Sequence, residues 1–233
     1  MKEQYTQLTH EPLLILPCAG MGTRVKPFFA GPKELMPSVV TGQPLIQFWL
    51  ELGQKLNLPI HIITRSEKLA LIEFVEQWKL NHHNWPITIQ ILDSLIGEWP
   101  STVLQSKPFW HEQNILGLPD TYFAPLSTLE ELVSQMKQKL IDVGILYHQL
   151  DELESPRDWG MVEFKERNVV RWCEKPVEAW KTNFAWGILS FSRKVGQTLL
   201  EELEASTQKH HAFEVSQSIY FTSLSLFKDL TRK

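Results

Sequence analysis

Two glycines and two basic residues follow an apolar run near the start of the sequence, in the segment LLILPCAGMGTRVKPFFAGPKELMP. The run Leu13–Leu16 is typical of a buried parallel strand, and the chain then breaks at Gly20 and Gly22. Because glycine has no Cβ, backbone N–H groups in such a loop can approach an anion closely, and Arg24 and Lys33 add two positive charges. This combination predicts a loop that binds a polyphosphate.

The loop differs from two well-known phosphate-binding loops. The dinucleotide-binding fingerprint requires a third glycine three residues after the second, and Val25 holds that position. The P-loop requires Gly-Lys-Ser or Gly-Lys-Thr, and the sequence contains no such triplet. Gly-x-Gly-Thr-Arg with a distal lysine is therefore a third pattern.

Apolar periodicity predicts the elements that would position this loop. We expect Ser66 to cap the helix at 66–78 and Ser127 to cap the helix at 127–140. We expect strands at residues 13–16, 60–63, 86–92, 114–118 and 143–147, helices at 44–56, 66–78, 102–110 and 127–140, and a turn at 96–101.

This alternation of strand and helix predicts a doubly wound, mainly parallel sheet with helices on both faces. Ligands of such sheets bind beyond the carboxyl ends of the strands. The glycine loop follows the first strand, and Asp120 follows the fourth, in the segment GLPDT. Both are therefore expected at the same edge, although Asp120 alone could equally cap a turn beside Thr121.

The pattern changes in the second half, which has no internal repeat and resembles an excursion from one sheet more than a separate domain. A charged loop occupies residues 151–158. We expect strands at 160–164, 169–173, 183–191 and 224–227, a turn at 166–168, and helices from 192 to about 203 and around 213–220.

Composition and charge narrow the class of protein. The chain has 233 residues, 43% hydrophobic and 21% charged, and a formal net charge of -4. These values suit one large globular domain, and the negative charge argues against a nucleic-acid partner. No apolar run reaches the ~18 residues of a membrane span. The polar first residues lack the apolar core of a secretory signal, and two cysteines suit a reducing compartment, so we expect a cytoplasmic protein.

Five segments, taken in order along the chain, resemble motifs of the sugar-phosphate nucleotidylyltransferase family. Glu214 also lies in a segment similar to the family's next acidic motif, so the resemblance covers roughly residues 13–220. The five segments are the glycine loop with Arg24 and Lys33, Gly117-Leu118-Pro119-Asp120-Thr121, Trp159-Gly160-Met161-Val162, Glu174-Lys175-Pro176 and Asn183-Phe184-Ala185-Trp186-Gly187-Ile188.

The resemblance implies a Mg²⁺-dependent enzyme that joins an NTP, dTTP or UTP, to a hexose 1-phosphate and releases pyrophosphate. It implies a Rossmann-like three-layer α/β/α nucleotide-diphospho-sugar transferase fold with a mixed, mainly parallel sheet. It also implies one nucleotidyltransferase domain over residues 1–233, with a nucleotide-binding half at 12–148 and a sugar-phosphate-binding half at 149–233. No nucleic acid or membrane is expected as a partner, and a homo-oligomer is compatible with the family.

The resemblance also assigns roles to single residues. Arg24, Lys33 and Asp120 would be catalytic: the two cations hold the triphosphate, and Asp120 holds Mg²⁺. The implied nucleotide-binding residues are Ala19, Gly20, Gly22, Thr23 and Arg24. The implied sugar-phosphate-binding residues are Gly160, Glu174, Lys175 and Trp186, with Lys175 on the phosphate and Gly160 and Glu174 on sugar hydroxyls. Glu174 could instead pair with Arg171.

Some positions depart from the family pattern. The second magnesium carboxylate of the family lies in an aromatic-x-Asp-x-Gly segment, and here only Asp229 lies near that place, too early in the sequence. The sequence also leaves two candidates, Gln90 and Leu92, for the position that recognises the nucleotide base. A catalytically impaired relative that binds nucleotide or nucleotide sugar therefore remains the alternative to an active enzyme. The pairs His82-His83 and His210-His211 are not expected to bind a metal, because neighbours in sequence do not share a face.

Overall fold

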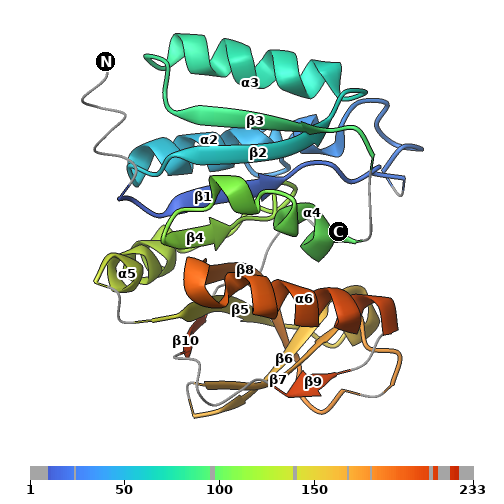
Figure 1. Ribbon diagram of the computed structural model, residues 1–233. Coiled ribbons are helices and arrows are strands. Elements are labelled where there is room, and N and C mark those ends of the chain that lie inside the picture. The colour runs from blue at the N-terminus through green and yellow to red at the C-terminus, as the bar shows by residue number, and fades with distance from the viewer. Residues whose placement is uncertain are drawn as a thin grey trace.

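The computed structural model of the protein describes residues 10–23, 25–94, 98–138, 141–166, 168–178, 180–209, 212–214 and 221–225. In this part of the chain, one sheet of ten strands forms the centre of the molecule, and helices lie on both sides of it (Figure 1). No helix among these residues is long and apolar enough to cross a lipid bilayer.

Four parallel strands form the first half of the sheet. Their order is β3 (Ile87–Leu92), β2 (Ile60–Arg65), β1 (Leu13–Pro17) and β4 (Gln113–Leu116). Because the strands are parallel, their carboxyl ends meet at one edge of the sheet. The loops after β1 and β4 are neighbours at this edge, as the sequence predicted.

The second half of the sheet is mixed. Strand β8 (Phe184–Ser192) lies antiparallel to β4 and to β5 (Val143–Gln149), and β5 pairs in parallel with β10 (Phe221–Ser225). Strands β6 (Gly160–Lys165) and β7 (Asn168–Glu174) form the predicted hairpin, β6 also pairs with β8, and β9 (Phe213–Glu214) pairs with β7.

The register of β4 and β8 joins the two halves at the same edge. Leu116, the last residue of β4, pairs with Leu189 of β8. The strands are antiparallel, so the chain that leaves β4 runs toward the β8 residues that precede Leu189. This register directs the segment with Asp120 and the segment with Trp186 to one edge of the sheet.

The helices lie in two layers. They are α2 (Leu45–Lys55), α3 (Leu69–Asn81), α4 (Trp99–Leu104), α5 (Leu126–Lys137) and α6 (Arg193–Lys209), with short 3-10 helices η1 (Lys33–Leu35), η2 (Lys107–Phe109) and η3 (Pro156–Asp158). Alternate β1 residues show which face each helix covers: Leu14 and Leu16 share a core cluster with α2, α3 and α5. Leu13 and Ile15 share the other with α4 and α6. The expected three-layer α/β/α fold with a mixed sheet and a parallel core is confirmed (Figure 1).

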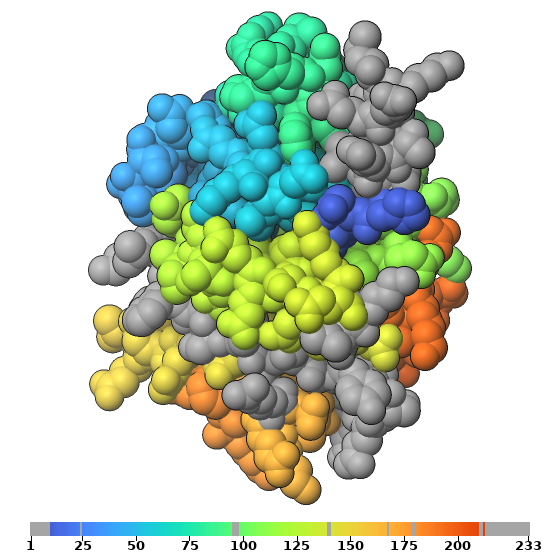
Figure 2. Space-filling view, turned by 90° about the vertical axis from the view of Figure 1, so that its left-hand side faces the viewer, coloured from blue at the N-terminus to red at the C-terminus, as the bar shows by residue number. Residues whose placement is uncertain are grey.

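Helix α5 lies across the boundary between the two halves. Figure 2 shows α5, in yellow-green, between the blue-to-teal first part of the chain and the orange segments of the second half. Its side chains Leu129, Leu132 and Met136 belong to the core cluster that also contains Trp49 of α2 and Ile188 of β8. One core cluster therefore includes residues from both halves.

The two predicted serine caps are wrong. Helix α3 begins at Leu69, after a turn at Ser66 that is closed by a hydrogen bond from Lys68 N to Arg65 O of 3.1 Å. Helix α5 follows Pro125, and Ser127 lies inside its first turn. Neither helix has a side-chain cap hydrogen bond. Because most of the stability of a protein helix comes from tertiary packing, a helix can form without a side-chain cap.

Two helices differ in extent from the prediction. Helix α4 begins at Trp99, inside the predicted turn, with Pro100 in the first turn where proline is tolerated, and it ends at Leu104. Helix α6 runs to Lys209, beyond its predicted end, because Ser206 and Thr207 continue its buried side. The charged residues of this polar stretch have good helix propensity and form the outer side.

The helix predicted around 213–220 is wrong at its first two residues, which form β9. Phe213 pairs with Trp172 and Glu214 with Arg171, so pairing with β7 outweighs the local helical pattern. The last strand, β10, begins at Phe221 and so starts earlier than the predicted residue 224.

Candidate functional site

The glycine loop begins directly beyond β1. Cys18 N donates to Ile63 O of β2 at 2.7 Å, which extends the strand pairing by one residue before the chain leaves the sheet. Gly22 has a φ of 60°, in the left-handed region where residues with a Cβ are strained. A Cβ on Gly20 would meet no atom within 4 Å, and Gly20 and Thr23 are exposed, whereas Ala19 is buried. The loop therefore has open space beside its backbone at Gly20.

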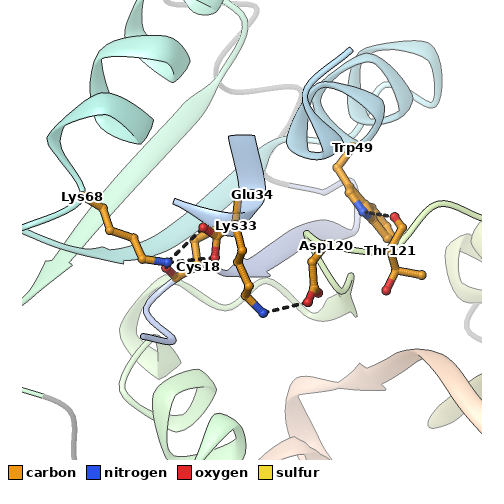
Figure 3. Close-up of polar contacts among 7 residues, drawn as sticks. All are labelled: Cys18, Lys33, Glu34, Trp49, Lys68, Asp120 and Thr121. Atoms are coloured by element: carbon orange, nitrogen blue, oxygen red, sulfur yellow. Dashed lines mark hydrogen bonds and ion pairs between the residues drawn. The ribbon is translucent and has the colours of Figure 1, made fainter. Parts of the chain in front are cut away.

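Lys33 and Asp120 meet at this edge of the sheet (Figure 3). Lys33 Nζ donates to Asp120 Oδ2 at 2.7 Å, and the two side chains are 24% and 28% exposed. Lys33 is carried by η1, and Asp120 by the loop after β4, next to β1 in the sheet. Two residues that the sequence singled out separately thus form a cation–carboxylate pair that a ligand can reach.

A buried ion pair lies behind Lys33. Lys68 Nζ donates to both carboxylate oxygens of Glu34, each at 2.9 Å, and to Cys18 O at 2.6 Å. The Glu34 side chain is fully buried and that of Lys68 is 12% exposed. Burial and the nearby Glu34 carboxylate raise the pKa of the Cys18 thiol, so this thiol stays protonated at neutral pH.

Asp120 is supported from the other side by Trp49. The indole Nε1 of this fully buried residue donates to Thr121 O at 2.9 Å. A Cβ on Gly117 would lie 2.5 Å from an atom of the Trp49 ring, so glycine is required for the loop to pack on the indole. Figure 3 shows Trp49 on the Asp120 side of the pair and Lys68 on the Lys33 side.

Glu174 is held by tryptophans in the second half of the sheet. Its carboxyl oxygen Oε1 accepts from Trp172 Nε1 at 3.0 Å and from Trp186 Nε1 at 2.6 Å, and Trp99 also hydrogen-bonds the side chain. Its backbone N donates to Ser206 Oγ of α6 at 3.2 Å. Burial raises the pKa of the Glu174 carboxyl, and the indole hydrogen bonds oppose this shift.

Gly160 and Lys175 lie next to Glu174. Gly160 pairs with Glu174 across the β6–β7 hairpin, and a Cβ on it would lie 1.9 Å from Trp186 Nε1. Lys175 has a φ of 49°, and its backbone N donates to Trp159 O at 2.9 Å, so the chain turns sharply after β7. The structure therefore brings together the four residues that the resemblance assigned to the sugar phosphate.

The surroundings of Glu174 differ from those expected of a carboxylate that faces a sugar. The side chain is buried, with only 4% of the residue exposed, and indoles surround Oε1. The alternative partner Arg171 donates instead to Glu163 Oε1 at 3.2 Å.

The two candidates for recognising the nucleotide base, Gln90 and Leu92, both contact other parts of the protein. Gln90 Oε1 lies 3.0 Å from Nε2 of the buried His61, and Gln90 Nε2 donates to Gln105 O at 3.1 Å. Leu92 is buried in the core cluster of the α4 and α6 face.

Arg24 and Asp229 lie outside the described residues, as do His210 and His211. Among the described residues, no group of three or more His, Cys, Asp or Glu side chains could hold a metal ion. Asp120 offers partly exposed carboxylate oxygens as metal ligands at the site. One carboxylate with substrate phosphates and waters is a common donor set for Mg²⁺, so Asp120 fits this ion when a polyphosphate supplies further oxygens.

Residues near the site that the sequence analysis missed include Lys68, Trp49, Trp99 and Trp172. Trp172 had a usable signal, since residues two apart on a strand share a face and Trp172 precedes Glu174 by two. The other three contact their partners across long stretches of sequence, and no local pattern marks such contacts.

A sequence model of the family described as Nucleotidyl transferase matches residues 14–226. A search of curated proteins gave no match.

Three solved structures illustrate the shared fold. A protein assigned as a glucose-1-phosphate thymidylyltransferase from Bacillus anthracis, in complex with a sucrose, is 19% identical, with a TM-score of 0.72 over 94% of this chain and 87% of that one. UDP-glucose pyrophosphorylase complexed with UDP-glucose is 18% identical, with a TM-score of 0.69 over 94% and 91%. The inositol-1-phosphate CTP transferase from T. maritima is 16% identical, with a TM-score of 0.68 over 93% and 86%.

Proposed function

Because this chain belongs to the nucleotidyl transferase family, we propose that it joins a nucleoside triphosphate to a sugar 1-phosphate and releases pyrophosphate. The observation that carries the proposal is the pair of Lys33 Nζ and Asp120 Oδ2, 2.7 Å apart, with the Lys33 side chain next to Gly22 of the glycine loop. A fixed cation, an accessible carboxylate and glycine backbone at one sheet edge are the parts that a metal-bound triphosphate needs.

In the proposed reaction, an oxygen of the sugar phosphate attacks the α-phosphorus of the triphosphate. The bond from the α-phosphorus to the bridging oxygen breaks, and pyrophosphate leaves with that oxygen. Both reactants are polyanions that repel each other, so catalysis consists mainly of positioning and charge neutralisation. This chemistry requires no covalent bond to the protein.

The nucleotide half of the site would hold the triphosphate. We assign Arg24 and Lys33 to the phosphate oxygens and to the charge that develops on the leaving pyrophosphate. The backbone of residues 19–23 would lie along the phosphates, since Gly20 leaves open space there. Asp120 would hold Mg²⁺, which when bound neutralises phosphate charge.

The sugar half of the site would hold the second substrate. We assign the Lys175 ammonium to the sugar phosphate, and Gly160, Glu174 and Trp186 to the wall of the sugar pocket. The indole hydrogen bonds fix the Glu174 carboxyl, so it would act as a rigid element of that wall.

The substrates are proposed from the solved relatives. Their names include thymidylyl transfer to glucose 1-phosphate, UDP-glucose and CTP with inositol 1-phosphate. We propose dTTP or UTP with a hexose 1-phosphate for this chain. The cysteines Cys18 and Cys173 are free, which supports a reducing, cytoplasmic setting.

A catalytically impaired relative that binds nucleotide or nucleotide sugar is the second candidate. It is favoured by the burial of Glu174, whose Oε1 already accepts two indole hydrogen bonds. Such a protein would bind UTP or UDP-glucose without releasing pyrophosphate.

The test is a panel of four NTPs against several sugar 1-phosphates, with pyrophosphate release as the readout. An active enzyme releases pyrophosphate only when NTP, sugar 1-phosphate and Mg²⁺ are all present. No release with any pair, despite measurable nucleotide binding by calorimetry, would establish the impaired relative instead.

A further inference from the structure

Lys68 connects three segments behind the candidate site. Its ammonium group donates to both oxygens of Glu34 in η1 and to the carbonyl of Cys18 at the end of β1 (Figure 3). Lys68 itself is the residue that precedes α3. Three donors thus meet three acceptor oxygens, and the ammonium group has its full set of hydrogen bonds.

A gain in stability from burial does not by itself explain the Lys68–Glu34 ion pair. Removing two charges from water has a large desolvation cost, and apolar residues of similar size are often as stabilising as a buried ion pair. Glu34 is nevertheless fully buried and Lys68 is 12% exposed. A role that an apolar contact could not fill would explain the pair. Its hydrogen bonds differ from apolar contacts in that they fix the direction of the Glu34 and Lys68 side chains.

The 3-10 geometry of η1 passes this direction to Lys33. With three residues per turn, consecutive side chains of such a helix point ~120° apart. Glu34 points to Lys68, Leu35 packs against the core, and Lys33 is left to point toward Asp120. Fixing the Glu34 carboxylate and the Leu35 side chain therefore fixes the direction of Lys33.

The bond to Cys18 O sets this arrangement relative to the sheet. Cys18 is itself tied to β2 through its N–H and Ile63 O at 2.7 Å. The ammonium group of Lys68 is thus held at a defined distance from the end of β1, where the glycine loop starts. Lys33 and the loop are consequently placed relative to one another.

We propose that Lys68 is a positioning residue that acts through Glu34 to hold Lys33 toward the triphosphate. The proposal rests on the proposed function, because it assigns Lys33 a nucleotide ligand. Lys68 would contact neither substrate. It would affect nucleotide binding only through the direction in which it holds the Lys33 side chain.

The test measures binding of Mg·UTP and Mg·dTTP by calorimetry, which requires no turnover. The variants are Lys68→Met, Lys33→Met and the double variant, with thermal unfolding as a check on folding. We expect Lys68→Met to weaken binding about tenfold, since a misplaced group loses much of its effect. The double variant should bind no more weakly than Lys33→Met alone, because Lys68 then has no cation to position.

Two further variants separate positioning from stability. Lys55→Met removes the lysine of an exposed pair with Glu130 at 2.9 Å and should leave binding unchanged. Lys68→Met leaves an unpaired buried carboxylate and could unfold the chain. Glu34→Gln with Lys68→Met removes both charges, and this folded variant should lose binding about as Lys68→Met does.

The outcomes are distinct. Equal binding by wild type and the Lys68 variants, or losses from Lys68→Met and Lys33→Met that add, would overturn the positioning role and leave the proposed function intact. Failure of the wild type to bind any nucleoside triphosphate would overturn the proposed function and the positioning role with it.

Discussion

Lys33 Nζ lies 2.7 Å from Asp120 Oδ2, although the two residues are 87 positions apart in the sequence. The protein without ligands therefore has its candidate phosphate cation and its candidate metal carboxylate paired with each other. Both side chains are partly exposed, so a ligand can reach them from solvent. A metal-bound triphosphate would offer each of them a new partner, the metal for Asp120 and phosphate oxygens for Lys33, so the pair can open when it enters.

Asp120→Asn is expected to reduce pyrophosphate release by ~10²–10³, because it removes one fixed charge from the site. Nucleotide binding without Mg²⁺ should change less than binding with Mg²⁺. Steady-state kinetics over a range of Mg²⁺ concentrations, with calorimetry in the presence of EDTA, measures both quantities. An equal loss with and without Mg²⁺ would contradict the metal role.

Lys33→Met is expected to change metal and nucleotide binding in opposite directions. Loss of the ammonium group removes one cation that competes for Asp120 Oδ2, so the weak binding of Mn²⁺, used in place of Mg²⁺, to the ligand-free protein should become a few-fold tighter. Binding of the triphosphate should weaken, since it loses a charge-assisted partner. Electron paramagnetic resonance of free Mn²⁺ checks the first effect, and weaker Mn²⁺ binding would contradict it.

The place of the nucleotide half could be predicted because its signals are local. The apolar run before Gly20 and the strand before Asp120 are both readable from consecutive residues, and parallel strands put their ends at one edge. The strand order that makes β1 and β4 neighbours is a long-range pairing, which the local pattern does not contain.

The support of the site could not be predicted for the same reason. Lys68 and Glu34 are 34 positions apart, and Trp49 and Thr121 are 72 apart. Each contact depends on how α2, α3 and η1 pack on the sheet. The motif located Glu174 in the sequence, but the burial of its side chain could not be predicted. That burial depends on Trp99 and Trp186, which come from other helices and strands.

Glu174→Gln is expected to stabilise the fold at neutral pH. Burial raises the pKa of the Glu174 carboxyl in the folded protein above its unfolded value, so the folded form binds this proton more tightly. The contribution of this carboxyl to the free energy of unfolding is therefore fully present below its pKa in the unfolded chain. It is lost as pH rises through its pKa in the folded protein. The variant keeps an oxygen for the indole N–H groups but has no proton to lose.

Melting temperatures of wild type and Glu174→Gln from pH 4 to pH 8 measure this effect. The difference should be small at the acid end and should grow in favour of the variant as pH rises. Glu130→Gln makes the same chemical change in an exposed pair with Lys55 and is the matched control. A difference that shrinks with rising pH would contradict the expected direction.

Gly160→Ala is expected to lower the stability of the fold, whereas Gly20→Ala is expected to weaken nucleotide binding. A Cβ at residue 160 would lie 1.9 Å from Trp186 Nε1 and 2.4 Å from Glu174 Oε1, so the indole must move. Overpacking of this kind costs ~1–3 kcal/mol, and chemical denaturation should show that loss.

Gly20→Ala should leave stability unchanged, because at residue 20 a Cβ meets no atom within 4 Å. The methyl group would instead occupy the open space assigned to phosphate, and Mg·UTP binding should weaken; unchanged binding with unchanged stability would remove the triphosphate from that side of the loop.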